Sequence, residues 1–265
     1  MFRRPRQTEP DRPSMRLRKT LQPLTVIPWG ALAMWYLGVP IGVGVNSTLS
    51  SPMVVVRDDD YTDAIERLES AGFNRSVPNR APPPEIMEDH PNPQQVLEDI
   101  NAGYKRLDIS CAVFDYPQGD PAEKALQVYL IPNSFAHVLQ DDTPQSSTRI
   151  GDTAQTTRFQ SYGSLYYPLE QALVESFVKA AIEEETDDGF SAWGKSLRSW
   201  VSLMTVYLEV DNDVLDMCPD KQAVDWYSHN FARIHEANFG PINRCISKRL
   251  GSGKEMPIDM RGSPL

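Results

Sequence analysis

The apolar residues of the first 75 positions form short runs that predict alternating helices and strands. The expected elements are a short helix, a glycine-interrupted strand, a buried strand and an amphipathic helix, over residues 29–38, 41–45, 53–56 and 61–71. Residues 53–56 predict a buried strand because four apolar residues stand there between turn signals. Asp60 precedes the second helix as a favoured N-cap residue, and Gly72 follows its end. This order of elements is typical of an α/β protein.

The next 85 residues predict two strands set between polar loops. Residues 74–95 contain six prolines and predict a loop or flap. Residues 107–113 alternate between apolar and polar side chains, as do residues 126–130, so each predicts a strand. The turn residues 117–121 lie between them, and we therefore expect the two strands to pair antiparallel. Residues 140–160 predict another polar loop.

From Pro168 onward the apolar residues recur every three or four positions, which predicts helices. One helix begins at Pro168, a second follows Gly194, and a third opens at Pro219. The expected fold class is α/β or α+β, with a mixed sheet in the first half and a helical second half. We expect residues 25–160 to form the mixed domain and residues 161–250 a helical region packed on it.

The two ends of the chain are expected to be disordered. Residues 1–24 are rich in arginine and proline and have few apolar anchors, and residues 251–265 form a second expected tail. The first 20 residues carry seven basic and two acidic side chains, although the whole chain has a net charge of −10. An acidic body disfavours a protein whose entire surface binds nucleic acid, which leaves the basic tail as the phosphate-binding element.

A charge-free stretch over residues 21–56 permits two interpretations. Residues 25–45 resemble a signal anchor, yet prolines and glycines divide them into pieces shorter than the roughly 20 residues that a bilayer requires. A buried helix, turn and strand explain the same residues, and this second interpretation is favoured. Three widely spaced cysteines form neither a disulfide framework nor a zinc motif. We expect a soluble, cytoplasmic protein without stable membrane association.

The most conspicuous polar cluster follows the predicted strand 53–56 and consists of Asp58, Asp59, Asp60 and Asp63. Ligand sites of α/β sheets are found where a strand hands over to a helix, and carboxylates there bind cationic groups. Aspartate is also favoured at a helix N-cap and in the first helical turn. Spacing alone favours the capping role and leaves the binding role open.

Asp108 and His137 are further candidate site residues. Asp108 lies in the predicted strand 107–113, where its side chain faces either solvent or a ligand. His137 follows Ser134, the expected N-cap of a short helix, and is either a general base or an ordinary surface histidine. The histidines lack metal-binding spacing, and glycine-rich nucleotide motifs and GxSxG are absent from the sequence. We therefore expect neither a metal nor a cofactor.

The residues Pro28–Leu32, Tyr36–Pro40, Val54–Asp59 and the helix ending at Gly72 together resemble a family of fungal proteins with a nucleotidyltransferase-like architecture. The resemblance covers about residues 25–135. Nucleotidyltransferases carry a Gly-Ser turn and a DxD carboxylate pair, whereas this chain has Gly30-Ala31 and Asn46-Ser47-Thr48. These departures suggest a catalytically degenerate, nucleotidyltransferase-like binding protein as one functional hypothesis.

The chain is also similar in size and acidic motif to fungal arginine-containing cyclodipeptide synthases. Asp59-Asp60-Tyr61-Thr62-Asp63 matches their DDxxE-type motif with aspartate at the last position. The resemblance implies a transferase of secondary metabolism that takes aminoacyl groups from aminoacyl-tRNA. Asp59, Asp60 and Asp63 would be catalytic, and Asp58, Asp108 and His137 would bind substrate, because carboxylates hold a guanidinium group well. The degenerate binding protein and, third, a membrane-anchored accessory protein are the alternatives.

Overall fold

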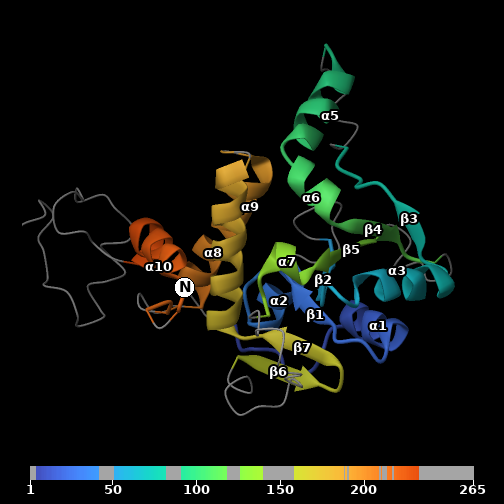
Figure 1. Ribbon diagram of the computed structural model, residues 1–265, viewed down its shortest axis with the longest axis horizontal. Helices are drawn as coiled ribbons and strands as arrows, with labels where there is room; N and C mark the ends of the chain where they lie inside the picture. Colours follow the sequence, from blue (N-terminus) through green and yellow to red (C-terminus); the bar gives the residue numbers. More distant parts are fainter. Residues whose placement is uncertain are drawn as a thin grey trace, which may run out of the picture.

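The computed structural model in Figure 1 describes residues 4–41, 51–81, 91–117, 126–139, 158–187, 189, 191–208, 210, 214–216 and 218–232. Strands and helices alternate in the first half, and helices dominate after residue 169. The expected mixed α/β fold class with a helical second half is therefore confirmed.

A five-stranded mixed sheet lies at the centre of the first half. Its strands are β1 (Ile27–Trp29), β2 (Met53–Val56), β3 (Asn74–Ser76), β4 (Ala112–Asp115) and β5 (Gln127–Pro132). Their order is β1-β2-β5-β4-β3, with β2 and β5 parallel and the other pairs antiparallel. All four residues of β2 are buried, which explains why this strand is a continuous apolar run.

The register of these strands determines which loops meet. Trp29 of β1 pairs with Met53, so the Gly30 turn lies at the amino end of β2. Val56 pairs with Pro132 in the parallel β2–β5 pair, so the carboxyl ends of both strands lie at the same edge of the sheet. We call this edge, which begins at Arg57 and Asn133, the carboxyl edge.

Helices cover the sheet and extend it. They are α1 (Arg12–Leu21), α2 (Ala31–Tyr36), α3 (Tyr61–Ser70), α5 (Pro93–Ala102), α6 (Lys105–Ser110), α7 (Asn133–Ala136), α8 (Glu170–Asp187), α9 (Ala192–Tyr207) and α10 (Lys221–Tyr227), followed by a π-helical turn η1 (Ser228–Ala232). A hairpin of β6 (Phe159–Tyr162) and β7 (Leu165–Pro168) precedes α8. Figure 1 shows α8 and α9 side by side, while α5, which has no buried residue, projects from the body.

A cluster of aromatic rings joins the two halves. Trp29 of β1 makes edge contacts with Phe177 of α8 and Trp200 of α9, at centroid distances of 5.5 and 5.7 Å. The indole Nε1 of Trp29 donates a hydrogen bond to Ser176 Oγ, 2.8 Å away. Trp193 stands 5.3 Å from Trp200 and completes the cluster. The sheet and the C-terminal helices thus share one hydrophobic core.

The expectation that residues 1–24 are a disordered tail is wrong, because α1 lies within them. The carboxylate of Asp11 accepts hydrogen bonds from the backbone N–H and the hydroxyl of Ser14, both 2.7 Å long, and so caps this helix. Leu17 and Leu21 are fully buried in the common core. The helix buries only a narrow apolar stripe, and its many arginines make the segment as a whole look polar.

The expected strand over residues 107–113 is also wrong in most of its length. Residues 105–110 form α6, and the strand begins only at Ala112. Leu107 is buried and Ile109 is 75% exposed, whereas a strand would turn both side chains to the same face. The alternation of apolar and polar residues therefore does not reflect a strand here. The antiparallel pairing with the following strand is confirmed by β4 and β5.

Short strands also occur in segments expected to be loops. β3 lies at the start of the 74–95 segment, and β6 begins at the end of the 140–160 segment. The expected strand over residues 41–45 and the tail over residues 251–265 lie outside the described residues, except for Ile41.

Within the described part of the chain, every helix is too short or too polar to cross a bilayer. Residues 27–36, in the stretch that resembled a signal anchor, form β1, the Gly30 turn and the six-residue α2, all within the core.

Candidate functional site

Asp58 and Ser134 connect the two parallel strands at the carboxyl edge. Ser134 Oγ donates a hydrogen bond of 2.6 Å to Asp58 Oδ1, and the Ser134 N–H lies 3.1 Å from both carboxylate oxygens. Both residues are exposed. The carboxylate thereby caps α7 and holds a serine hydroxyl in a fixed place at the surface.

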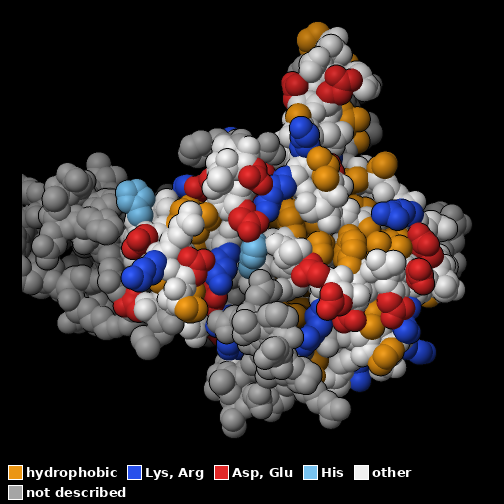
Figure 2. All heavy atoms as spheres, in the orientation of Figure 1, with side chains coloured by type: hydrophobic (Ala, Val, Ile, Leu, Met, Phe, Trp, Pro, Cys, Tyr) orange, Lys and Arg blue, Asp and Glu red, His pale blue; other side chains and the backbone are white. Residues whose placement is uncertain are grey.

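His137 ends the same short helix and faces a carboxylate of α8. Its backbone is left-handed, with φ of 52°, and its Nε2 lies 2.9 Å from Glu183 Oε1. Arg106 of α6 donates to the other oxygen of Glu183, and its guanidinium stands 4.8 Å from the centre of the Phe135 ring. The Nε2 atom is close to this carboxylate but makes no hydrogen bond of good geometry within the described part of the chain, while Arg106 holds the carboxylate in place. Figure 2 shows acidic and basic side chains side by side over α7, α8 and α9.

The remaining aspartates of the acidic motif have separate surroundings. Asp63 accepts a hydrogen bond from Arg67 one turn later, at 2.8 Å, and Arg67 also donates to the Gln22 carbonyl at 2.7 Å. Asp59 is exposed on the loop before α3, and Asp60 is partly exposed. Asp63 therefore forms an ion pair within α3. Asp58 instead contacts Ser134 of α7, the helix that His137 ends.

The interpretation of Asp60 as a side-chain cap of α3 is wrong. Asp60 occupies the N-cap position, but its backbone is helical (φ −90°, ψ −5°) and its side chain makes no capping hydrogen bond. An N-cap side chain reaches the following N–H groups from extended backbone, as Asp11 does with ψ of 158°.

We therefore expect Asp60→Ala to change the free energy of unfolding by less than about 0.5 kcal/mol, as surface substitutions do. Asp220 is the matched control, because its carboxylate accepts from the N–H groups of Gln222 and Ala223 at the start of α10. Asp220→Ala should cost about 0.5–2 kcal/mol. Urea unfolding of both variants measures the difference, and equal losses would contradict it.

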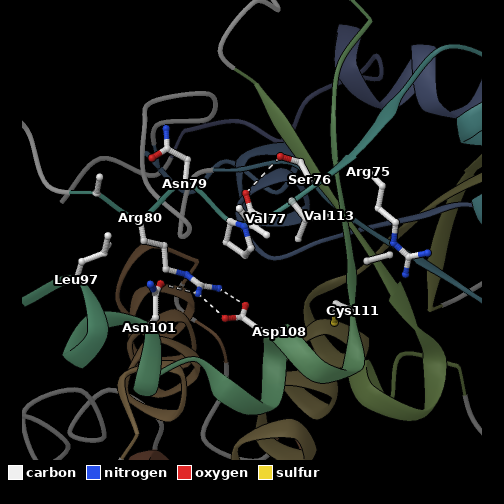
Figure 3. Close-up of a pocket in the computed structure, with 13 residues that line it drawn as sticks. Arg75, Ser76, Val77, Asn79, Arg80, Leu97, Asn101, Asp108, Cys111 and Val113 are labelled. Atoms are coloured by element: carbon white, nitrogen blue, oxygen red, sulfur yellow. Dashed lines mark hydrogen bonds and ion pairs between the residues drawn. The ribbon is translucent and has the colours of Figure 1, made fainter. Parts of the chain in front are cut away.

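Asp108 lies apart from the acidic motif, on α6, where it lines a cavity of about 560 Å³ (Figure 3). Its two carboxylate oxygens accept hydrogen bonds from the guanidinium of Arg80, one of them 2.6 Å from Nη1. The Arg80 side chain is only 3% exposed and lies 4.3 Å from the centre of the Tyr104 ring. Burial lowers the pKa of Arg80, but the hydrogen bonds and charge of Asp108 outweigh burial and raise it.

The sequence did not identify Arg80 or Glu183 as site residues. Arg80 stands in a proline-rich segment and meets Asp108 from 28 positions away. Glu183 belongs to an acidic run that is typical of a solvated helix end. Their partners are distant along the chain, so spacing carries no signal of either contact.

The Gly30 turn, to which the nucleotidyltransferase resemblance points, is filled by the core. A Cβ atom added to Gly30 would lie 2.9 Å from Cη2 of Trp200 and 3.2 Å from Sδ of Met53. An indole ring therefore occupies the space over this glycine.

Among the described residues, no group of three histidine, cysteine or carboxylate side chains could hold a metal ion. Known family models, curated proteins and solved structures all fail to match this chain, so its function has to be inferred from its own residues.

Proposed function

We propose that this protein is an aminoacyl transferase that uses the carboxyl edge, with Ser134 as the acceptor of the aminoacyl group. The observation that carries the proposal is the 2.6 Å hydrogen bond from the Ser134 hydroxyl to Asp58, with His137 three residues after Ser134. A nucleophile beside a base, with an imidazole near by, supplies the groups that acyl transfer needs.

The proposed step conserves atoms and charge. Ser134 Oγ attacks the ester carbonyl of an aminoacyl-tRNA while its proton passes to the Asp58 carboxylate. The bond between the carbonyl carbon and the ribose oxygen then breaks, and the ribose oxygen takes up that proton. The amine of a second aminoacyl-tRNA then attacks the serine ester, which forms the first amide bond, and Ser134 Oγ leaves and takes up the amine proton. The free amine of the resulting dipeptidyl-tRNA attacks its own ester carbonyl, which forms the second amide bond and closes the ring, and the ribose oxygen of the second tRNA leaves with the proton. His137 is the proposed carrier of the amine proton in both steps.

Charge at the same edge favours an arginyl substrate. Asp59 is exposed and Asp60 is partly exposed and makes no capping hydrogen bond, and both follow Asp58 directly in the sequence. Carboxylates bind guanidinium groups through paired hydrogen bonds. Helix α1 carries four basic and no acidic residues, which supports contact with tRNA phosphates. An aminoacyl-tRNA substrate also implies a cytoplasmic location.

The experiment combines product analysis with stability. Expression in a bacterial host should yield an arginine-containing diketopiperazine, and incubation with radiolabelled arginyl-tRNA should label the protein. Ser134→Ala should abolish both signals. Asp58→Asn keeps a capping oxygen for α7, so its melting temperature should stay unchanged while the product falls by about 100-fold or more. Asp63→Asn, which affects only the Arg67 pair, is the control and should keep its product.

A product level unchanged in the Ser134 and Asp58 variants would reject the assignment. If the Ser134 and Asp58 variants kept their product while Asp59→Asn or Asp60→Asn lost it, the catalytic site would have to be assigned to the acidic motif instead.

A catalytically degenerate binding protein is the second candidate, because Trp200 fills the Gly30 turn, at which a nucleotidyltransferase would hold its nucleotide. Its ligand would have to bind elsewhere on the protein. Under this hypothesis the host metabolites stay unchanged and the protein acquires no label, although it still retains aminoacyl-tRNA on a filter.

A further inference from the structure

The cavity beside Asp108 is separate from the proposed transfer site. It lies between β3 with its following segment, helices α5 and α6, and the start of β4. The apolar part of its wall includes Val77, Pro78, Leu97 and Val113. The polar part includes Asn79, Asn101 and Arg80. A volume of about 560 Å³ lies within the usual range of about 300–1,000 Å³ for small-molecule sites.

The buried cation of the cavity is paired with a carboxylate. Arg80 and Asp108 share paired hydrogen bonds, and Arg75, which also lines the cavity, is directed away from this pair in Figure 3. An anionic ligand would have to displace Asp108 from Arg80, and a cationic ligand would face a buried guanidinium. Both costs favour an uncharged ligand.

The polar groups specify a hydrogen-bond acceptor on that ligand. The side-chain oxygen of Asn101 accepts from Arg80 Nη1 at 3.3 Å. This bond directs the oxygen of the carboxamide towards Arg80 and leaves the N–H donors of its amide nitrogen for a ligand. A carbonyl group is the uncharged partner that fits such a donor.

The apolar part of the wall continues to the protein surface. Val77, which lines the cavity, is 79% exposed. Figure 2 shows hydrophobic side chains gathered on the surface between α3 and α6. The apolar part of a ligand can therefore contact both the cavity wall and the apolar surface next to it.

Cys111 also lines the cavity, but as a thiol rather than a nucleophile. Burial raises its pKa well above the ordinary value, and the charge of Asp108 raises it further. A protonated thiol is a weak nucleophile, so the cavity is suited to reversible binding.

We propose that this cavity is a binding site for a small uncharged molecule with a carbonyl group and an apolar body. It does not depend on the proposed transferase reaction, because it shares none of its residues with that site.

Two probes that differ only in charge test the proposal: N-acetyl-leucine amide and N-acetyl-leucine. Ligand-observed NMR titration of the full chain at neutral pH should show the amide bound at least tenfold more tightly than the carboxylate. Asn101→Leu removes the donors and should weaken amide binding at least fivefold. Gln94→Leu, an exposed substitution on the same helix outside the cavity lining, should leave it unchanged.

Asp108→Asn tests the charge argument directly, because it removes the negative charge that pairs with Arg80. This variant should reverse the preference and bind the carboxylate more tightly than the amide. Circular dichroism of each variant establishes that it is folded. Absence of amide binding to the wild-type protein, a wild-type preference for the carboxylate, or an unchanged ranking in folded Asp108→Asn would overturn the proposal.

Discussion

Gly30→Ala is expected to lower the free energy of unfolding by about 2–6 kcal/mol. Gly30 has φ of 59° and ψ of −130°, a conformation that costs an L-residue about 1–3 kcal/mol. The new methyl group would also lie 2.9 Å from the buried Trp200 ring, and overpacking adds about 1–3 kcal/mol. Thermal and urea unfolding, followed by circular dichroism, measure the loss.

Gly189→Ala is the matched control for this substitution. Gly189 has a similar φ of 66°, but nothing lies within 4 Å of the position that its Cβ would take. Its variant should therefore lose only the backbone part, about 1–2 kcal/mol. Equal losses in the two variants would show that contact with Trp200 contributes nothing.

Asp108→Ala should destabilise the protein by about 2–4 kcal/mol. The substitution leaves the guanidinium of Arg80, only 3% exposed, without its carboxylate, and breaking a buried ion pair costs about 3–5 kcal/mol. Asp108 itself is 29% exposed, so water reaches the site and reduces the loss. Urea unfolding at neutral pH measures it.

Two further variants test the cause of this loss. Asp63→Ala breaks the ion pair with Arg67, whose side chains are 36% and 46% exposed, and should cost less than about 1 kcal/mol. The double variant Arg80→Met with Asp108→Leu removes both charges and should recover most of the stability. A double variant as unstable as Asp108→Ala would contradict the role assigned to the buried charge.

Elements with a strong local pattern of apolar residues were predictable from the sequence. The continuous apolar run of β2 and the three- and four-residue spacing of α8 both reflect burial. Helix α1 was not predictable in this way, because it buries only Leu17, Leu21 and the small Ser14 among its arginines. The α6 segment has the alternation of a strand, yet the tertiary structure leaves Ile109 exposed.

The candidate sites depended more on topology than on motif. A strand followed by aspartates predicted a polar carboxyl edge, and the parallel β2–β5 pair brings Ser134 to Asp58. The contact between Asp63 and Arg67 follows from their spacing of four residues on the predicted helix. The sequence could not reveal that Asp108 lies on a helix beside Arg80, because that contact is fixed by how the chain folds.

The position of α1 has a consequence for synthesis on the ribosome. Its cap residue Asp11 accepts a hydrogen bond from the hydroxyl of Tyr167, and Arg6 forms an ion pair with Glu170 at 2.8 Å. At about 5–20 residues per second, roughly 8–30 s separate the emergence of α1 from that of these partners. During this interval α1 can pack on α3, whose Arg67 donates to the Gln22 carbonyl, but the core around Leu17 and Leu21 is not yet complete. The nascent chain must keep this segment from aggregating until β7 and α8 have been translated.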